Sequence, residues 1–258
     1  MSKIGVIGKG FVGSAVANYY PDAIIYDKYK KIGSMDEVNK ADIIFICVPT
    51  PPSKDGYDLS AVKESAERIA DGKIIVIKST ITPGTTEELQ KQYPNKKFIF
   101  CPEFLTEKNA NGDFANPDRI IMGYTNKSKE ILYQLAPYFP LDYTKWLIMP
   151  AIEAELVKLF SNFFLVNKVV LFNLFFDICE EVGLNYEEVR EGVAADTRIG
   201  RSHTKIWHGG GRGAGGSCFP KDMHALINWL KKKDFKKDMY FRLVQSLNNK
   251  YLKESGKE

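Results

Sequence analysis

The chain has 258 residues, of which 44% are apolar and 26% are charged, as expected for a globular protein of one large domain or two modest ones. Its 36 basic and 32 acidic residues leave a net charge of +4, which argues against a nucleic-acid-binding function. The most apolar segment, residues 163–176, is interrupted by Asn167, Lys168 and Asn173. It is shorter than the roughly 20 residues that span a bilayer, so we expect a buried helix there and no membrane contact.

The first 150 residues alternate short apolar, β-branched runs with helical stretches. Continuous apolar runs are typical of parallel strands covered on both faces, and strands that interleave with helices indicate crossover connections. We therefore expect an α/β fold with a Rossmann-type, doubly wound parallel sheet. The expected strands are residues 3–8, 23–27, 42–48, 73–79, 97–101, 119–123 and 145–149, and the expected helices are residues 11–20, 58–71, 85–93 and 127–136.

After Pro150 the pattern becomes helical only. We expect one long helix over residues 151–183, and an irregular stretch rich in Gly, Arg and His over residues 195–217. Shorter helices are expected at residues 186–194, 220–232 and 235–254. The sequence thus predicts two domains, an α/β domain at 1–150 and a smaller all-helical domain at 151–258.

Residues 8–13 read GKGFVG, a G-x-G-x-x-G motif that follows an apolar strand and precedes a helix. Gly8 allows the tight turn, Gly10 lets the backbone approach a pyrophosphate, and Gly13 lets the helix pack closely on the strand. The helix that begins near Phe11 presents unpaired N–H groups to the phosphates. This pattern predicts a dinucleotide site in the first domain.

Asp27 ends the second expected strand, 19 residues after Gly8. A carboxylate at this place accepts hydrogen bonds from ribose hydroxyls and repels a 2′-phosphate, so the expected cofactor is NAD rather than NADP. Lys28, the next residue, slightly weakens that preference.

Three of the four cysteines, Cys47, Cys101 and Cys179, lie in apolar or helical runs and are expected to be small buried residues. No signal peptide precedes the first expected strand, so we expect free thiols in a reducing, cytoplasmic compartment. No cysteine pair has metal-ligand spacing, and we expect no metal site. No zinc pattern joins the fourth cysteine, Cys218, to the histidines, which are His203, His208 and His224.

Cys218 follows a run of glycines and stands just before Pro220, a residue suited to the start of a helix. A helix N-terminus and the neighbouring Lys221 both favour the thiolate, and the glycines allow a substrate to approach closely. Asp222 in the first turn could orient a water or accept a proton. These residues indicate a nucleophile at the start of the helix.

The chain resembles the UDP-glucose/GDP-mannose dehydrogenases, because eight motifs occur in the order of that family. They are GKGFVG at 8–13, CVPTP at 47–51, KSTITPGTT at 78–86, PEFLTE at 102–107, PDRIIMG at 117–123, ELVKLFSN at 155–162, DTRIG at 196–200 and GGSCFPKD at 215–222. The resemblance implies an enzyme of polysaccharide biosynthesis that uses two NAD to oxidise the C6 alcohol of a nucleotide sugar, UDP-glucose above all. The aldehyde is held on a cysteine as a thiohemiacetal and then as a thioester.

By this resemblance Cys218 is the nucleophile, and Lys158 and Asn162 stabilise the alkoxide at C6. Asp222 and Thr80 hold water or relay a proton. The remaining catalytic candidate, Glu107, assists hydrolysis. The residues expected to bind NAD are Gly8, Gly10, Phe11, Val12, Gly13, Asp27, Lys28, Val48, Pro49, Thr50 and Thr80. The residues expected to bind substrate are Glu103, Phe104, Leu105, Lys158, Asn162, Arg198 and Gly215, and Arg198 is the arginine that reaches the neighbouring subunit of a homodimer built on the long helix.

Three features depart from the family pattern. We expect this chain to lack the third domain, which grips the uridine end of the substrate, and Thr106 and Ala214 replace an arginine and an aromatic residue. Binding energy remote from C6 helps to position the reacting centre, so the departures leave alternatives open. These are a shortened chain, a minimal enzyme completed by a partner chain, a dehydrogenase of GDP-mannose or a UDP-amino sugar, and a non-catalytic NAD-binding interaction protein.

Overall fold

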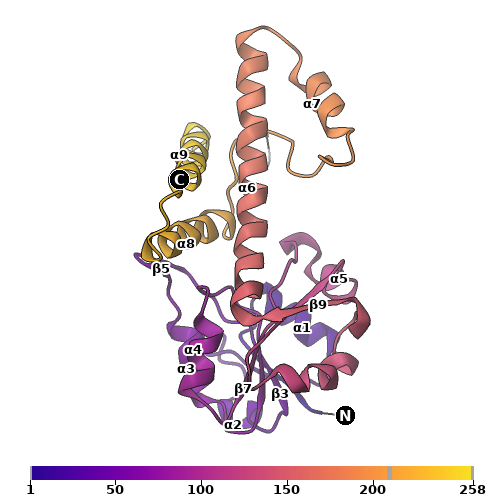
Figure 1. Cartoon of the computed structure of the whole chain (residues 1–258). Helices are drawn as coiled ribbons and strands as arrows, with labels where there is room; N and C mark the ends of the chain where they lie inside the picture. Colours follow the sequence, from indigo (N-terminus) through magenta and orange to yellow (C-terminus); the bar gives the residue numbers. More distant parts are fainter. Residues whose placement is uncertain (1, 208–210, 257–258) are drawn as a thin grey trace. The chain divides into compact units, whose positions relative to one another are not determined.

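The computed structural model describes residues 2–207 and 211–256, and the chain divides into two units (Figure 1). The first comprises Met1–Ser53 and Tyr57–Lys158, and the second comprises Lys54–Gly56 and Leu159–Glu258. The first unit is α/β and the second is helical, which confirms the expected fold class. The domain boundary expected at residue 150 stays a prediction.

A seven-stranded sheet forms the centre of the first unit, in the order β2-β1-β3-β6-β7-β8-β9. Its strands are β1 Ile4–Ile7, β2 Ile24–Tyr26, β3 Ile43–Ile46, β6 Ile74–Ile77, β7 Lys97–Phe100, β8 Ile120–Tyr124 and β9 Trp146–Pro150. The neighbouring strands β2, β1, β3, β6 and β7 all run parallel to one another. The strand β8 runs antiparallel to β7, and β9 runs parallel to β8. The sheet is thus mostly parallel, and the β7–β8 pair departs from the parallel sheet that the sequence predicted. A strand that runs antiparallel to its neighbour starts at the edge of the sheet where that neighbour ends, so the segment 101–119 needs no full crossover.

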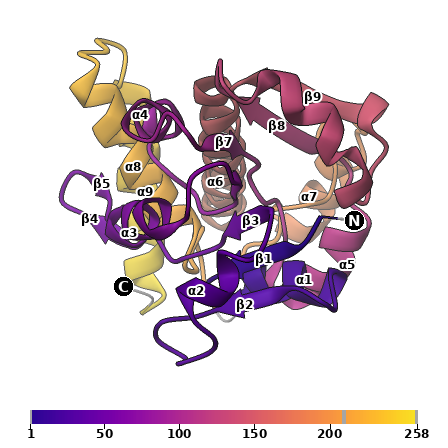
Figure 2. The ribbon, with the colours of Figure 1, turned by 90° about the horizontal axis from the view of Figure 1, so that it is seen from below.

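Two apolar clusters cover the two faces of the sheet. One joins Val6, Phe45, Val76 and Ile99 to α1 (Phe11–Tyr19) and α5 (Ala110–Ala115). The other joins Ile44, Ile75, Phe98 and Ile121 to α2 (Met35–Val38), α3 (Ser60–Arg68) and α4 (Thr85–Gln92). Figure 2 shows α3 and α4 on one side of the row of strands and α1 and α5 on the other. This double covering explains why the strands read as continuous apolar runs.

Several short elements before α6 were not expected from the sequence. They are α2, α5, the strands β4 (Pro52–Ser53) and β5 (Gly56–Tyr57), and the 3₁₀ helices η1 (Glu107–Asn109) and η3 (Tyr143–Lys145). The helix expected at 127–136 is a 3₁₀ helix, η2 (Lys129–Tyr138), with Pro137 inside it. Proline lacks the N–H that an α-helical bond requires, which explains the change of helix type.

Four helices make up most of the second unit: α6 (Ala151–Glu181), α7 (Tyr186–Ala194), α8 (Phe219–Lys232) and α9 (Met239–Glu254). The first two turns of α6 belong to the first unit. The helix ends just before Gly183, which has φ +68°, and Asn185 caps α7 by accepting the N–H of Glu187. The last helix begins at Met239, four residues later than expected.

The helix α6 corrects one expectation. Among the described residues it is the one helix that is long and apolar enough, by length and composition, to cross a membrane. The argument that residues 163–176 are too short therefore fails, since they lie inside a 31-residue helix. Its polar residues Glu155, Lys158, Asn162 and Asn173 are buried, a pattern that also occurs in the core helices of folded domains.

Candidate active-site residues

The glycine motif forms the turn between β1 and α1. Gly8 has φ +91°, and a Cβ placed on it would lie 2.6 Å from the carbonyl oxygen of Cys47. A Cβ on Gly13 would lie 1.9 Å from the carbonyl oxygen of Gly8, whereas one on Gly10 would meet no atom within 4 Å. The turn thus requires glycine at both ends and leaves open space beside the backbone of Gly10, as a phosphate-binding turn needs.

Asp27 is buried at the end of β2, where its carboxylate accepts the N–H groups of Lys9 at 2.7 Å and Lys30 at 2.8 Å. Burial acts to raise the pKa of Asp27, but these backbone donors outweigh it and hold the pKa below its ordinary value. A carboxylate has about four lone-pair sites, so it keeps acceptor capacity for ribose hydroxyls. The neighbouring Lys28 is paired with Glu64 at 2.9 Å.

A cavity of about 50 Å³ lies beside the end of β2 in the first unit. Gly8, Asp27, Lys28, Val48 and Pro49 all line it. Five of the residues expected to bind NAD therefore surround one small space at the end of β2, where the carboxylate of Asp27 lies.

Thr50 and Thr80 are both buried, and the hydroxyl of Thr50 donates to the carbonyl oxygen of Thr80 at 2.8 Å. This bond joins the loop after β3 to the loop after β6. The loop after β6 also contains a buried lysine that we did not expect to be functional. Lys78 donates to the sulfur of Cys101 at 3.5 Å and to the carbonyl oxygen of Pro102 at 3.4 Å.

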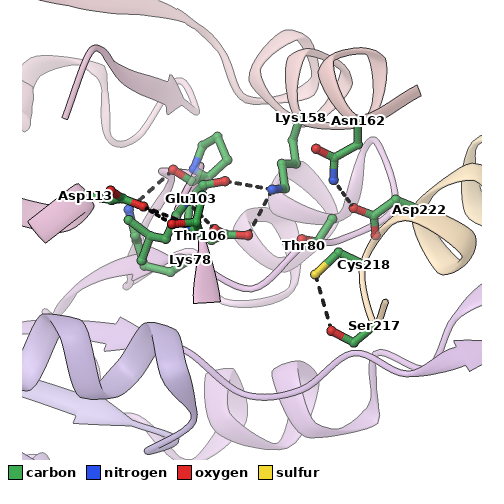
Figure 3. Close-up of polar contacts among 12 residues, drawn as sticks. Lys78, Thr80, Glu103, Thr106, Asp113, Lys158, Asn162, Ser217, Cys218 and Asp222 are labelled. Atoms are coloured by element: carbon green, nitrogen blue, oxygen red, sulfur yellow. Dashed lines mark hydrogen bonds and ion pairs between the residues drawn. The ribbon is translucent and has the colours of Figure 1, made fainter. Parts of the chain in front are cut away.

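Lys158 and Glu103 form a buried ion pair in the first unit (Figure 3). The ammonium of Lys158 donates to Glu103 Oε1 at 2.9 Å and to the Glu103 carbonyl oxygen at 2.8 Å. It also lies 5.3 Å from the centre of the Phe104 ring. Removal of either charge would leave the other buried and unpaired. Sequence reasoning assigned both residues to the substrate but missed their pairing.

A second cavity of the first unit, about 260 Å³, is lined by Glu103, Phe104, Leu105, Thr106 and Lys78 among others. The backbone at Glu107 begins the short helix η1, and its side chain lies outside the described part of the structure. The role expected for Glu107 therefore stays a prediction.

Glu155 is a buried carboxyl that sequence reasoning overlooked. It lies on α6, is 1% exposed, and accepts hydrogen bonds from the N–H of Gly84 and from both the N–H and the hydroxyl of Thr86. These donors belong to the start of α4. Burial raises the pKa of Glu155 to about 7, although the hydrogen bonds act in the opposite direction.

In the second unit, Asn162 on α6 donates to Asp222 Oδ2 at 2.6 Å (Figure 3). Lys221 donates to Asp222 Oδ1 at 2.8 Å. Asp222 is 1% exposed and lies in the first turn of α8, where the helix dipole stabilises a negative charge. The structure thus brings Asn162 to the adjacent residues Lys221 and Asp222, across 60 positions between Asn162 and Asp222.

Cys218 is the N-cap residue of α8, and Pro220 occupies the second helical position rather than the first. The thiol of Cys218 is half-buried, and its sulfur lies 3.7 Å from the hydroxyl oxygen of Ser217. Cys47, Cys101 and Cys179 are free and buried, as expected, and burial raises the pKa of Cys47 to about 12. Among the cysteines, Cys218 therefore has the exposure and the helix terminus that a nucleophile needs.

The second unit also contains a cavity of about 1100 Å³. Arg201, His203 and Lys205 line it together with Gly215 and Phe219, and no acidic residue is among the described residues of its wall. Sequence reasoning considered His203 only as a metal ligand and missed Arg201 and Lys205. The basic, irregular composition of residues 195–217 was the signal that could have indicated an anion site.

Arg198 is 88% exposed and is paired with Asp196 at 2.6 Å. Its expected contact with a neighbouring subunit stays a prediction. His208 lies outside the described residues, and within the described ranges no group of three or more His, Cys, Asp or Glu could hold a metal ion.

The fold and these residues define a class of protein: a dinucleotide-binding domain of the dehydrogenase type, followed by a helical unit that carries a thiol at a helix start. Comparison with known proteins narrows the class. Residues 19–138 match the NAD-binding domain of the UDP-glucose/GDP-mannose dehydrogenase family, and residues 152–250 match its central domain. The chain belongs to this family, and NAD is the cofactor of its first domain.

Among individual relatives, UDP-glucose 6-dehydrogenase of Rickettsia conorii is 38% identical over 202 residues, which cover 75% of this chain and 46% of that protein. The enzyme of the same name from Pseudomonas aeruginosa is 35% identical over 224 residues, 81% of this chain and 48% of that protein. The solved UDP-glucose dehydrogenase of Pyrobaculum islandicum is similar with a TM-score of 0.82 at 28% identity, covering 97% of this chain and 68% of that one. The chain spans about half the length of the curated relatives it matches.

Proposed function

We propose that this chain acts as an NAD-dependent nucleotide-sugar 6-dehydrogenase that oxidises a C6 alcohol to a carboxylate, with UDP-glucose as its substrate. Family membership supports the reaction class, and relatives 35–38% identical are named UDP-glucose 6-dehydrogenases. One observation carries the mechanism. The half-buried thiol of Cys218 stands at the start of α8, one turn before the buried Asp222.

The residues that would hold NAD are those of the glycine turn, Asp27, and the loop Val48–Thr50. Bound NAD supplies the hydride acceptor for each of the two oxidations. The open backbone at Gly10 fits a pyrophosphate, and the carboxylate of Asp27 fits the hydroxyls of a ribose.

The role of Cys218 is to keep the intermediate on the protein between the two oxidations. Its sulfur adds to the aldehyde carbon to form a thiohemiacetal. After the second oxidation, water attacks the thioester carbonyl, the C–S bond breaks, and the sulfur leaves as thiolate. Each oxidation also releases one proton from the substrate. Addition of the thiolate to the aldehyde takes up one proton, and hydrolysis to carboxylate and thiolate releases two.

Lys158 and Asn162 stabilise the negative charge that develops on the C6 oxygen, and Asp222 receives protons or orients water. The pairing of Lys158 with Glu103 and of Asn162 with Asp222 supports these roles, since each pair fixes its donors in one orientation. Thr80 and Glu107 assist the hydrolytic step.

The cavity of the second unit supports an anionic substrate. Arg201, His203 and Lys205 on its wall can neutralise a diphosphate, and about 1100 Å³ exceeds the usual size of small-molecule sites. We propose that this cavity receives the diphosphate of the nucleotide sugar.

We further propose a cytoplasmic homodimer built on α6. Phe160, Phe164, Leu171 and Ile178 on this helix are 42–64% exposed, and at 100° per residue they fall within a stripe about 40° wide. An apolar stripe with a repeat near seven residues is typical of a helix that pairs with another helix.

The test is to incubate the chain with NAD and, separately, UDP-glucose, GDP-mannose and a UDP-amino sugar, while NADH is followed by its absorbance. We expect two NADH per UDP-glucose consumed. The Cys218→Ala variant can form no thiohemiacetal, so it should make no second NADH and no carboxylate. Cys179→Ala, which removes a buried thiol of the same unit, is the matched control and should keep its activity. NAD binding without NADH from any sugar nucleotide would establish a non-catalytic protein instead.

A further inference from the structure

The backbone four residues before Cys218 is held by a side chain of α9. Asn248 is fully buried and bonds both polar groups of Ala214: its Oδ1 accepts the Ala214 N–H at 2.7 Å, and its Nδ2 donates to the Ala214 carbonyl oxygen at 3.0 Å. An asparagine amide holds an acceptor oxygen and a donor NH2 group side by side in fixed geometry. The pair of bonds therefore fixes both the position and the orientation of this peptide.

Arg212 anchors the same segment two residues earlier. Its Nε donates to Asn173 Oδ1 at 3.0 Å, its guanidinium pairs with Asp177, and its plane lies 4.4 Å from the ring centre of Tyr251. These contacts tie the segment to α6 and α9. The N–H of Arg212 itself donates to the hydroxyl of Ser255.

Two glycines with positive φ lie in the segment between the anchors and the thiol. Gly213 has φ +79°, and a Cβ there would lie 3.2 Å from Leu252 and Tyr251 side-chain atoms. Gly216, two residues before Cys218, also has φ +79°. The glycines let the chain follow this path, but they do not enforce it, so the enforcement comes from the polar anchors.

We infer that Asn248 is a positioning residue for Cys218: by clamping the peptide of Ala214, it sets where the glycine-rich segment delivers the thiol at the start of α8. The inference rests on the proposed function, in which Cys218 is the nucleophile. A misplacement of about 1 Å can cost about a hundredfold in rate, so release of the clamp lowers turnover without touching the NAD-binding unit.

Two variants test the clamp. Asn248→Ala removes both bonds, and we expect kcat to fall by roughly ten- to a hundredfold, while the Kd for NAD stays unchanged. Asn248→Asp keeps the acceptor, but an ionised carboxylate cannot donate to the Ala214 carbonyl oxygen. Its protonated form can, so we expect the activity of this variant relative to the native chain to rise as the pH falls. The activity of Asn248→Ala relative to the native chain should not change with pH, because alanine cannot titrate.

The charged groups of the anchor are Arg212, Asp177 and Glu254, and they are common to all the variants. Asn185→Ala is the matched control, because it removes another side-chain bond to backbone in the second unit at the start of α7. It should leave kcat unchanged. A loss of kcat in this control equal to that in Asn248→Ala would show a general structural effect and overturn the inference.

Hydrogen exchange of the peptide that contains residues 211–217 gives a readout that does not depend on turnover. Release of the clamp should speed exchange at Ala214 in Asn248→Ala, and not in Asn185→Ala. If the native chain makes no NADH, the proposed function fails while this measurement still judges the clamp. Unchanged hydrogen exchange at Ala214 in Asn248→Ala would refute the positioning role. Full activity of Asn248→Ala together with a flat relative pH profile of Asn248→Asp would also refute it.

Discussion

The buried carboxyl of Glu155 gives a prediction whose size follows from the structure. Its surroundings pull its pKa in two directions, because burial disfavours the charged form while three hydrogen bonds from the start of α4 favour it. Burial prevails, and the pKa rises from 4.5 to about 7. A carboxyl whose pKa is higher in the folded than in the unfolded state stabilises the fold most when it is protonated.

The free energy of unfolding should therefore fall as the pH rises from about 5 through 7, and level off above about 8. With pKa values of 4.5 unfolded and about 7 folded, linkage gives a loss of about 2.5 kcal/mol between pH 5 and pH 8. The Glu155→Gln variant cannot titrate at this position. The difference in unfolding free energy between the native chain and this variant should change by the same amount across that range.

Urea unfolding followed by far-UV circular dichroism at several pH values measures this difference. The control Glu88→Gln removes an exposed acid from the first turn of α4, the helix whose start binds Glu155. The difference in unfolding free energy between this control and the native chain should stay nearly constant with pH. A flat difference for Glu155→Gln would refute the reasoning. It would mean that the hydrogen bonds from the start of α4 hold the pKa of the Glu155 carboxyl near its ordinary value in spite of burial.

Three further variants test other parts of the molecule. Gly13→Ala forces a Cβ to within 1.9 Å of the Gly8 carbonyl oxygen; it should abolish NAD binding in a fluorescence titration, and unchanged affinity would contradict the glycine turn. Lys158→Met leaves Glu103 buried without its partner and should cost about 3 kcal/mol or more in urea unfolding, so equal stability would show that the pair is dispensable. Phe164→Glu places a charge in the exposed stripe of α6, and sedimentation should show the mass fall from twice 29.2 kDa to 29.2 kDa; a native chain that is already monomeric would refute the dimer.

The strands could be predicted because each is covered on both faces and must be apolar along its whole length. The expected runs contain β1 to β3, β6 and β7, and the ends of β8 and β9 each fall one residue later than expected. The strands β4 and β5 have two residues each and α2 has four, which is too short for any periodicity to appear. The direction of β8 depends on the path of the chain before it, and not on the residues of the strand.

The glycine turn and the helix start at Cys218 were readable because each depends on residues that are close in sequence. The partners of buried polar groups were not readable in this way. Glu155 meets Thr86 across 69 positions, and Asn248 meets Ala214 across 34. No local pattern encodes such a pairing, because it depends on how the elements pack.

The sequence nevertheless carries a trace of these pairings. A polar residue on the buried face of a helix must find a hydrogen-bond partner, because an unpaired buried group is costly. On α6, Glu155, Lys158, Asn162 and Asn173 are all buried among apolar neighbours, and each is bonded to a group of its own unit. Sequence reasoning weighed Lys158 in this way and took Asn162 from the family motif. Applied to every polar residue on the buried face of the long helix, the same physical rule would have singled out Glu155 and Asn173 as residues with partners, though not the identity of those partners.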